Sequence, residues 1–127
     1  MNIIPDTNIF IDFWKRPTES IKKIFDEEDV IICGPVRAEL LQGALSVKDF
    51  NKMVDLFGAF KNVDISTDDW VTLGRNLYLL RTHGKTVPLA DAIIATLAIK
   101  FDIPVWTRDK HFPLMKEVLS DLKIFVE

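Results

Sequence analysis

Short runs of apolar residues alternate along the chain with longer segments in which apolar residues recur every three or four positions. The short runs predict five strands, at residues 2–4, 30–32, 62–65, 104–107 and 123–126. The longer segments predict six helices, at residues 10–14, 18–28, 36–45, 47–60, 68–83 and 89–101. In the second of these helices, Ile21, Ile24 and Phe25 form an apolar stripe opposite charged residues, as in an amphipathic surface helix.

This alternation predicts the fold class. Strands that are short and continuously apolar, and that are separated by helices, are typical of a parallel sheet covered by helices on both faces. Right-handed crossovers then give an α/β fold, a three-layer α/β/α sandwich around a mainly parallel five-stranded sheet. The 127 residues contain no repeat, linker or low-complexity tract, so we expect one domain spanning residues 1–127.

One predicted helix contains an unexpected charge. The segment VPLADAIIATLAIKF is almost wholly apolar, but it carries Asp91 near its start. A negative charge in the first turn complements the helix dipole, which is an ordinary explanation. The other acidic residues decide whether this explanation is enough.

Composition narrows the functional classes. Hydrophobic residues make up 48% and charged residues 28% of the chain, which is typical of a soluble globular protein. The sequence shows neither a signal peptide nor a membrane-spanning run, and Cys33 is the only cysteine, so we expect a cytoplasmic protein without membrane contact. The net charge of −3 excludes nucleic-acid binding by bulk electrostatics unless cations bridge the two molecules.

Four acidic residues are predicted to meet at one edge of the sheet, beyond the carboxyl ends of the strands. Asp6 follows the first strand, Asp109 follows the fourth, and Asp91 begins the helix that leads into the fourth strand. Glu39 lies about one turn into the helix after the second strand. Each acid has an ordinary explanation by itself: a helix cap for Asp6, an Asx-turn for Asp109, a dipole-complementing charge for Asp91 and a solvated helix residue for Glu39. Together they indicate a divalent cation, because Mg²⁺ takes carboxylate oxygens, waters and phosphate oxygens as ligands.

The predicted site extends to its polar neighbours. Two divalent ions about 4 Å apart can activate water and stabilise the leaving oxygen in phosphodiester cleavage. The neutral side chains that could orient ligands are those of Thr7, Asn8 and Thr107. The basic side chains that could meet a phosphate are those of Arg108 and Lys110. His111 is either a substrate contact or part of a turn, and we favour the turn. The two histidines and one cysteine are too dispersed for a zinc site.

Four sequence blocks, IIPDTNIFIDFW, VRAELLQGA, VPLADAIIATLA and VWTRDKHF, resemble in this order the acidic motifs of PIN-domain nucleases. The whole chain is similar to the VapC-type toxins of type II toxin–antitoxin systems. The resemblance implies a Mg²⁺- or Mn²⁺-dependent endoribonuclease, a cognate VapB-type antitoxin that blocks the site, and a homodimer. It also implies that the metal-binding and catalytic residues are Asp6, Glu39, Asp91 and Asp109. Pro5 departs from the family pattern, because it removes a backbone donor at the strand end.

Two other functions remain open on the sequence. A phosphohydrolase with an aspartyl-phosphate intermediate could use Asp6, but such enzymes need an acid two residues later, where this chain has Asn8. A catalytically silent PIN module would serve only protein contacts, and the intact set of four acids argues against it. A small DNA-binding protein encoded just upstream would favour the toxin.

Overall fold

A computed structural model describes all 127 residues of the chain. The elements follow one another as β1 (Asn2–Pro5), α1 (Thr7–Lys15), α2 (Glu19–Glu27), β2 (Asp29–Cys33), α3 (Gly34–Gln42), α4 (Val47–Gly58), β3 (Lys61–Val63), α5 (Asp69–Thr82), α6 (Leu89–Phe101), β4 (Val105–Trp106) and α7 (His111–Lys116). The predicted α/β fold with a parallel sheet is confirmed.

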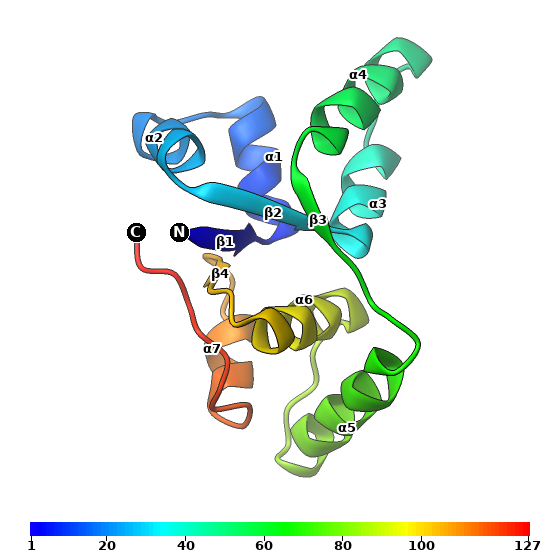
Figure 1. Cartoon of the computed structure of the whole chain (residues 1–127), viewed down its shortest axis with the longest axis vertical. Helices are drawn as coiled ribbons and strands as arrows, with labels where there is room; N and C mark the ends of the chain where they lie inside the picture. The colour runs from blue at the N-terminus through cyan, green and yellow to red at the C-terminus, as the bar shows by residue number, and fades with distance from the viewer.

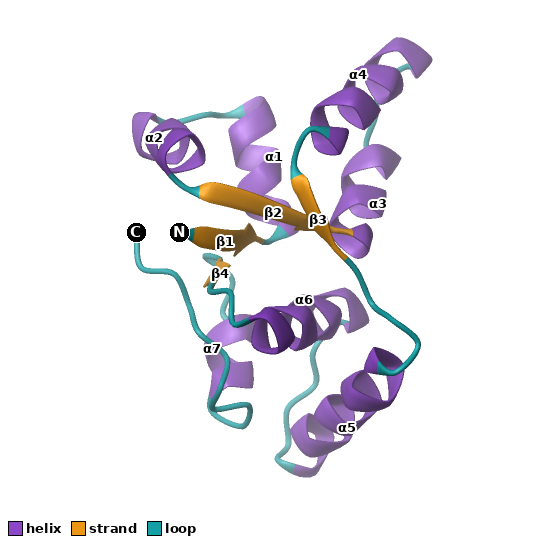
Figure 2. Cartoon of the chain, in the orientation of Figure 1, coloured by secondary structure: helices purple, strands orange, loops and turns teal.

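The sheet has four parallel strands in the order β3-β2-β1-β4, with β1 in an inner position (Figure 2). The strands are apolar throughout because both faces are covered: α1 to α4 gather on one side of the strands, and α5 to α7 gather on the other (Figure 1). The carboxyl ends of β1 and β4 are neighbours, since Pro5 is in register with Trp106. The loops that follow these two strands therefore begin side by side.

The helix α6 has the bounds predicted from the sequence and is the most buried helix of the fold. Every residue from Ala92 to Ala98 is buried, because α6 packs between the sheet, α5, α3 and α7. This environment explains a segment that is apolar all round. No helix of the protein combines the length and apolar character needed to cross a membrane.

The sheet has four strands, so the predicted fifth strand at residues 123–126 is wrong. Only a single parallel bridge joins Ile124 to Val105. The reason lies in β4, which spans two residues and offers one of them for pairing: Val105 donates to the Lys123 carbonyl oxygen and accepts from the Phe125 amide. Residues 123–126 are apolar because Ile124 and Phe125 pack against the core.

Two further expectations need correction. The third strand spans Lys61–Val63 rather than residues 62–65, because the Asp64 side chain turns back to accept a 2.6 Å hydrogen bond from the amide of Gly34 at the start of α3. A Cβ at Gly34 would lie 2.8 Å from that Asp64 oxygen, so a larger residue there would displace the Asp64 side chain. A seventh helix, α7, occupies the segment from His111 that was expected to be a turn.

The Pro5 ring does not disturb the sheet. The amides on either side of it, those of Ile4 and Asp6, donate to the carbonyl oxygens of Pro104 and Trp106 at 3.0 Å. The hydrogen bonds between β1 and β4 therefore use alternate residues and do not need a donor at Pro5.

Candidate metal centre

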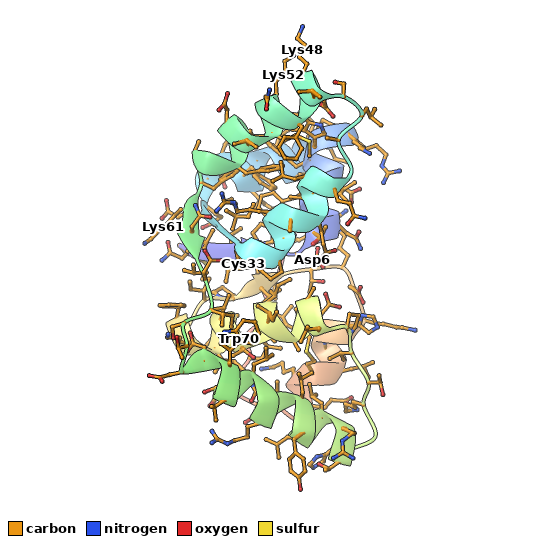
Figure 3. The ribbon with its side chains drawn as sticks, turned by 90° about the vertical axis from the view of Figure 1, so that its right-hand side faces the viewer. Asp6, Cys33, Lys48, Lys52, Lys61 and Trp70 are labelled. Atoms are coloured by element: carbon orange, nitrogen blue, oxygen red, sulfur yellow. The ribbon has the colours of Figure 1, made fainter.

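Asp6 lies at the junction of β1 and α1 and is 5% exposed. Its carboxylate caps α1, since Oδ1 accepts a 3.0 Å hydrogen bond from the Ile9 amide. Figure 3 shows Asp6 at mid-height in the molecule, between α3 and α6. Burial raises the pKa of the Asp6 carboxyl above its usual value, and the nearby Asp109 charge adds to this, while hydrogen bonds from Thr107 and Ile9 oppose it. Asp6 is thus both a helix cap and a buried acid close enough to Asp109 to feel its charge.

Thr107, the residue that follows β4, connects two of the predicted acids. Its hydroxyl donates a short hydrogen bond to Oδ2 of Asp6, and its oxygen accepts a 2.9 Å hydrogen bond from the Asp109 amide. The side chain therefore fixes the loop after β4 against the start of α1. This is the orienting role that the sequence suggested for a neutral polar residue at this position.

Asp91 lies in the first turn of α6, as predicted, but its side chain does not cap the helix. Its carboxylate is 20% exposed and faces His111, whose Nδ1 is 3.1 Å from Asp91 Oδ2. Burial raises the pKa of Asp91, and the charges of Asp109 and Asp6 raise it further, against the opposing effect of His111. Asp91 therefore lies close enough to both other acids to feel their charges.

Asp109 forms the Asx-turn that the sequence suggested, because its Oδ1 accepts from the His111 amide at 2.9 Å. The same oxygen lies 3.2 Å from Nδ1 of the His111 ring. Ligand atoms of Asp91, Asp109 and His111 all lie within 4.8 Å of one another, and the three residues are half-buried. The sequence favoured a turn at His111 and did not indicate that its ring faces the acids, although its position two residues after Asp109 was the available signal.

Glu39 is placed differently from the other three acids. Its side chain is exposed on α3 and makes no hydrogen bond or ion pair. This is the solvated helix residue that the sequence offered as the ordinary explanation, because Val36 and Leu40 face the core while Glu39 faces solvent. Glu39 lines a cavity of about 410 Å³ together with residues of α1 and α4, among them Ile11, Lys15 and Met53. The structure thus brings Asp6, Asp91 and Asp109 together and leaves Glu39 exposed on α3.

Of the remaining predicted residues, three make no side-chain hydrogen bond or ion pair, and one is held in an ion pair. Thr7 and Asn8 open α1 and make no side-chain hydrogen bond, although the Asn8 amide helps to stabilise the charge of Asp6. Lys110 is exposed and unpaired. Arg108, in contrast, forms a two-pronged ion pair with Glu127, with both nitrogen–oxygen distances 2.9 Å. Glu127 Oε1 also accepts from the Trp106 indole at 2.6 Å, so Arg108 is held against the end of the described chain.

The donor set fits a hard divalent cation. Three carboxylates converge, and the pKa values of two of them, Asp6 and Asp91, are raised by burial and by neighbouring charges. No lysine or arginine forms an ion pair with any of the three. Buried carboxylates are stable when a cation neutralises them, and carboxylate oxygens suit Mg²⁺ and Mn²⁺. The ligands of such an ion would be Asp6, Asp91 and Asp109.

Solved structures with the same fold share nearly the full length of this chain. VapBC2 from Rickettsia felis was solved bound to a DNA fragment from the VapBC2 promoter. It is 20% identical to this chain with a TM-score of 0.80, and the match covers 98% of each chain. FitAcB from Neisseria gonorrhoeae is 23% identical with a TM-score of 0.77, over 98% of this chain and 96% of that chain. The Sarcin-Ricin loop cleaving toxin VapC20 from Mycobacterium tuberculosis is 14% identical with a TM-score of 0.66, over 84% of this chain and 89% of that chain.

Comparison of the sequence with known protein families identifies the family of this chain. No curated protein matches the chain significantly. The family model of the PIN domain matches residues 3–118, a span that runs from the second residue of β1 past the end of α7 and includes all the predicted site residues. The chain belongs to the PIN-domain family.

Proposed function

We propose that this PIN-domain protein is a Mg²⁺- or Mn²⁺-dependent endoribonuclease and the toxin of a VapBC-type toxin–antitoxin pair. The observation that supports this most is the convergence of Asp6, Asp91 and Asp109 from three separate elements. The likeness to VapBC2 and to the RNA-cleaving VapC20 supports the toxin class. The proposed site of action is the cytoplasm.

The bound cation would supply an activated water and charge stabilisation for the leaving oxygen of the phosphodiester. The residues of the chain hold the reacting groups in place. Asp6 is held by its cap on α1 and by Thr107, so its carboxylate has one orientation. Asp91 and Asp109 approach from α6 and from the loop after β4, and Glu39, exposed on α3, is the proposed fourth acid of the site.

The RNA contacts are proposed to be basic side chains beside the acids. Lys110 is exposed and unpaired, so it is free to meet a phosphate. Arg108 first has to exchange Glu127 for the phosphate, because both guanidinium contacts are taken. We therefore expect a larger effect on RNA affinity from Lys110→Ala than from Arg108→Ala.

A test of the function compares RNA cleavage by the purified protein in Mg²⁺, in Mn²⁺ and in EDTA. Asp6→Asn and Asp91→Asn remove ligand charge, and each is expected to lower the cleavage rate at least ~10²-fold. Asp55→Asn is the matched control, since Asp55 is exposed on α4 and makes no contact with the site. Cleavage that continues undiminished in EDTA would refute the metal-dependent mechanism.

The proposed partner is a VapB-type antitoxin that binds next to the site. The cavity between α1, α3 and α4 is lined by Trp14, Leu40, Met53 and Phe57 among others, and Glu39 stands at its edge. An apolar segment of the antitoxin would fill this cavity, and an arginine beyond it would reach the acids and exclude metal and phosphate. Co-purification of an antitoxin that leaves the nuclease fully active would contradict the inhibitory role.

A homodimer is proposed as the assembly of the toxin. Apolar side chains on the outer face of α5 are available for such contacts, because Trp70, Val71 and Tyr78 are each more than half exposed. Figure 3 shows Trp70 near the start of this helix. Light scattering of the purified protein gives the mass directly, and a mass of one chain at micromolar concentration would refute the dimer.

A further inference from the structure

His111 lies among the acids of the site but has no role in the proposed function. It begins α7, and its ring lies between carboxylates that come from two different elements. Nδ1 is 3.1 Å from Asp91 Oδ2 and 3.2 Å from Asp109 Oδ1, and the side chain is 29% exposed. A single nitrogen atom thus faces two acids that the proposed function assigns to the metal.

The distances from His111 Nδ1 to the two carboxylate oxygens match those between neighbouring ligands around one ion. A six-coordinate Mg²⁺ or Mn²⁺ with bonds of about 2.1 Å separates adjacent ligand atoms by roughly 3.0 Å. The two nitrogen–oxygen distances at His111 lie close to that value, and all three ligand atoms lie within 4.8 Å of one another. The His111 amide also donates to Asp109 at 2.9 Å, which fixes the ring relative to that acid.

The ring can present a lone pair to this position. Nε2 has no hydrogen-bond partner within the protein, so it can carry the proton toward solvent and leave Nδ1 free to coordinate. In that tautomer the site offers one imidazole nitrogen beside several carboxylate oxygens. Magnesium strongly prefers oxygen, whereas transition ions bind nitrogen well and increasingly so from Mn²⁺ to Co²⁺ and Ni²⁺.

We propose that His111 is a nitrogen ligand of the ion held by Asp91 and Asp109, and that it shifts the preference of the site from Mg²⁺ toward Mn²⁺ and Co²⁺. The inference rests on the proposed metal-dependent function and adds to it the identity of a ligand and the basis of ion choice. It differs from a role in which His111 only donates a hydrogen bond that keeps the two acids in place. A hydrogen-bonding role affects all divalent ions about equally, whereas a nitrogen ligand affects their ratio.

The first test reads the ligand directly in the unmodified protein. The chain has two histidines, so labelling all histidine with ¹⁵N marks only His111 and His83. His83 lies at the exposed end of α5 with Nδ1 2.8 Å from the Leu79 carbonyl oxygen, away from the acids. Pulsed electron paramagnetic resonance of bound Mn²⁺ is expected to show coupling to a directly bonded imidazole nitrogen, with the frequency changing on ¹⁵N labelling.

The second test measures ion preference. Calorimetry gives the dissociation constants of Mg²⁺, Mn²⁺ and Co²⁺ for the wild type, for His111→Gln and for the control His83→Gln. We expect His111→Gln to lower the preference for Mn²⁺ and Co²⁺ over Mg²⁺ by about tenfold, and His83→Gln to leave it unchanged. Thermal melting checks that both variants are folded, and the labelling experiment decides the question if His111→Gln is not.

The outcomes separate the two levels of the proposal. Mn²⁺ that binds without nitrogen coupling, or an equal loss of affinity for all three ions in His111→Gln, overturns the ligand role of His111 and leaves the metal-dependent function standing. Failure of the wild type to bind any of the three ions at millimolar concentration overturns the proposed function itself. Nitrogen coupling together with the changed ratio supports both.

Discussion

Replacing Asp91 with asparagine is expected to stabilise the metal-free protein. Folding brings Asp91 within 4.8 Å of Asp109, and burial together with this charge raises the pKa of Asp91. Two unit charges 4.8 Å apart repel by roughly 0.9 kcal/mol in water and by roughly 3.5 kcal/mol at an effective dielectric constant of 20. His111 beside Asp91 offsets part of this repulsion, so a gain toward the lower value is expected.

The expected gain for Asp91→Asn in EDTA is therefore about 1 kcal/mol, or a rise in melting temperature of roughly 3–5 °C. Asparagine has nearly the same volume and its side-chain oxygen can still accept from His111, so little else changes. Metal reverses the order: at a hundred times its dissociation constant, Mn²⁺ adds about 2.7 kcal/mol to the wild type by linkage and much less to the variant.

Thermal melting of both proteins in EDTA and across a Mn²⁺ titration measures the two effects, with Asp55→Asn as a control that behaves like the wild type. If Asp91 only complemented the dipole of α6, Asp91→Asn would be slightly less stable in EDTA and would respond to Mn²⁺ as the wild type does. That pair of results would refute the reasoning.

The structure supports three further predictions. Thr107→Val removes the hydroxyl that joins Asp6 to the loop of Asp109, and it is expected to weaken Mn²⁺ binding, measured by calorimetry, 10- to 100-fold. Thr72→Val on the exposed side of α5 is the control, and an unchanged affinity in Thr107→Val would show that Thr107 does not belong to the site. Hydrogen bonds from Ser66 and from the Lys100 ammonium lower the pKa of Asp69 to about 2, so the stability that Asp69 provides is present above pH 4 and is lost as the pH falls toward 2. Urea unfolding should show a difference in the free energy of unfolding between wild type and Asp69→Asn at pH 6 that closes at pH 2, and a constant difference would contradict this. Added salt should weaken antitoxin binding, because an arginine among carboxylates contributes through charge, and a salt-independent dissociation constant would exclude that contact.

The parts of the fold that could be predicted from the sequence are those in which local pattern and burial agree. The helix at Leu89–Phe101 is apolar all round and its middle, from Ala92 to Ala98, is buried all round, so its bounds follow from the sequence. The segment 123–126 is equally apolar, but its pairing depends on the length of β4, a distant element. Strand formation there could not be read from the segment itself.

The site shows the same division. Asp6 and Asp109 were predicted because each follows the carboxyl end of a strand, and Asp91 because it begins the helix that leads into β4; the strand order brings such positions together. Glu39 was predicted from its place one turn into the helix after the second strand, but the packing of α3 buries Val36 and Leu40 and leaves Glu39 exposed. The pairing of Arg108 with Glu127 and the position of the His111 ring are set by tertiary contacts, so no local pattern indicates them.

The central claim is that RNA cleavage depends on an ion held by Asp6, Asp91 and Asp109. The most direct measurement follows Mn²⁺ occupancy, by electron paramagnetic resonance, and the RNA cleavage rate in the same samples across one Mn²⁺ titration. We predict that the two curves coincide for the wild type, that both shift to higher Mn²⁺ in Asp91→Asn, and that Asp55→Asn leaves both unchanged. Cleavage at full rate before any Mn²⁺ is bound, or full occupancy in Asp91→Asn at the wild-type concentration, would contradict the claim.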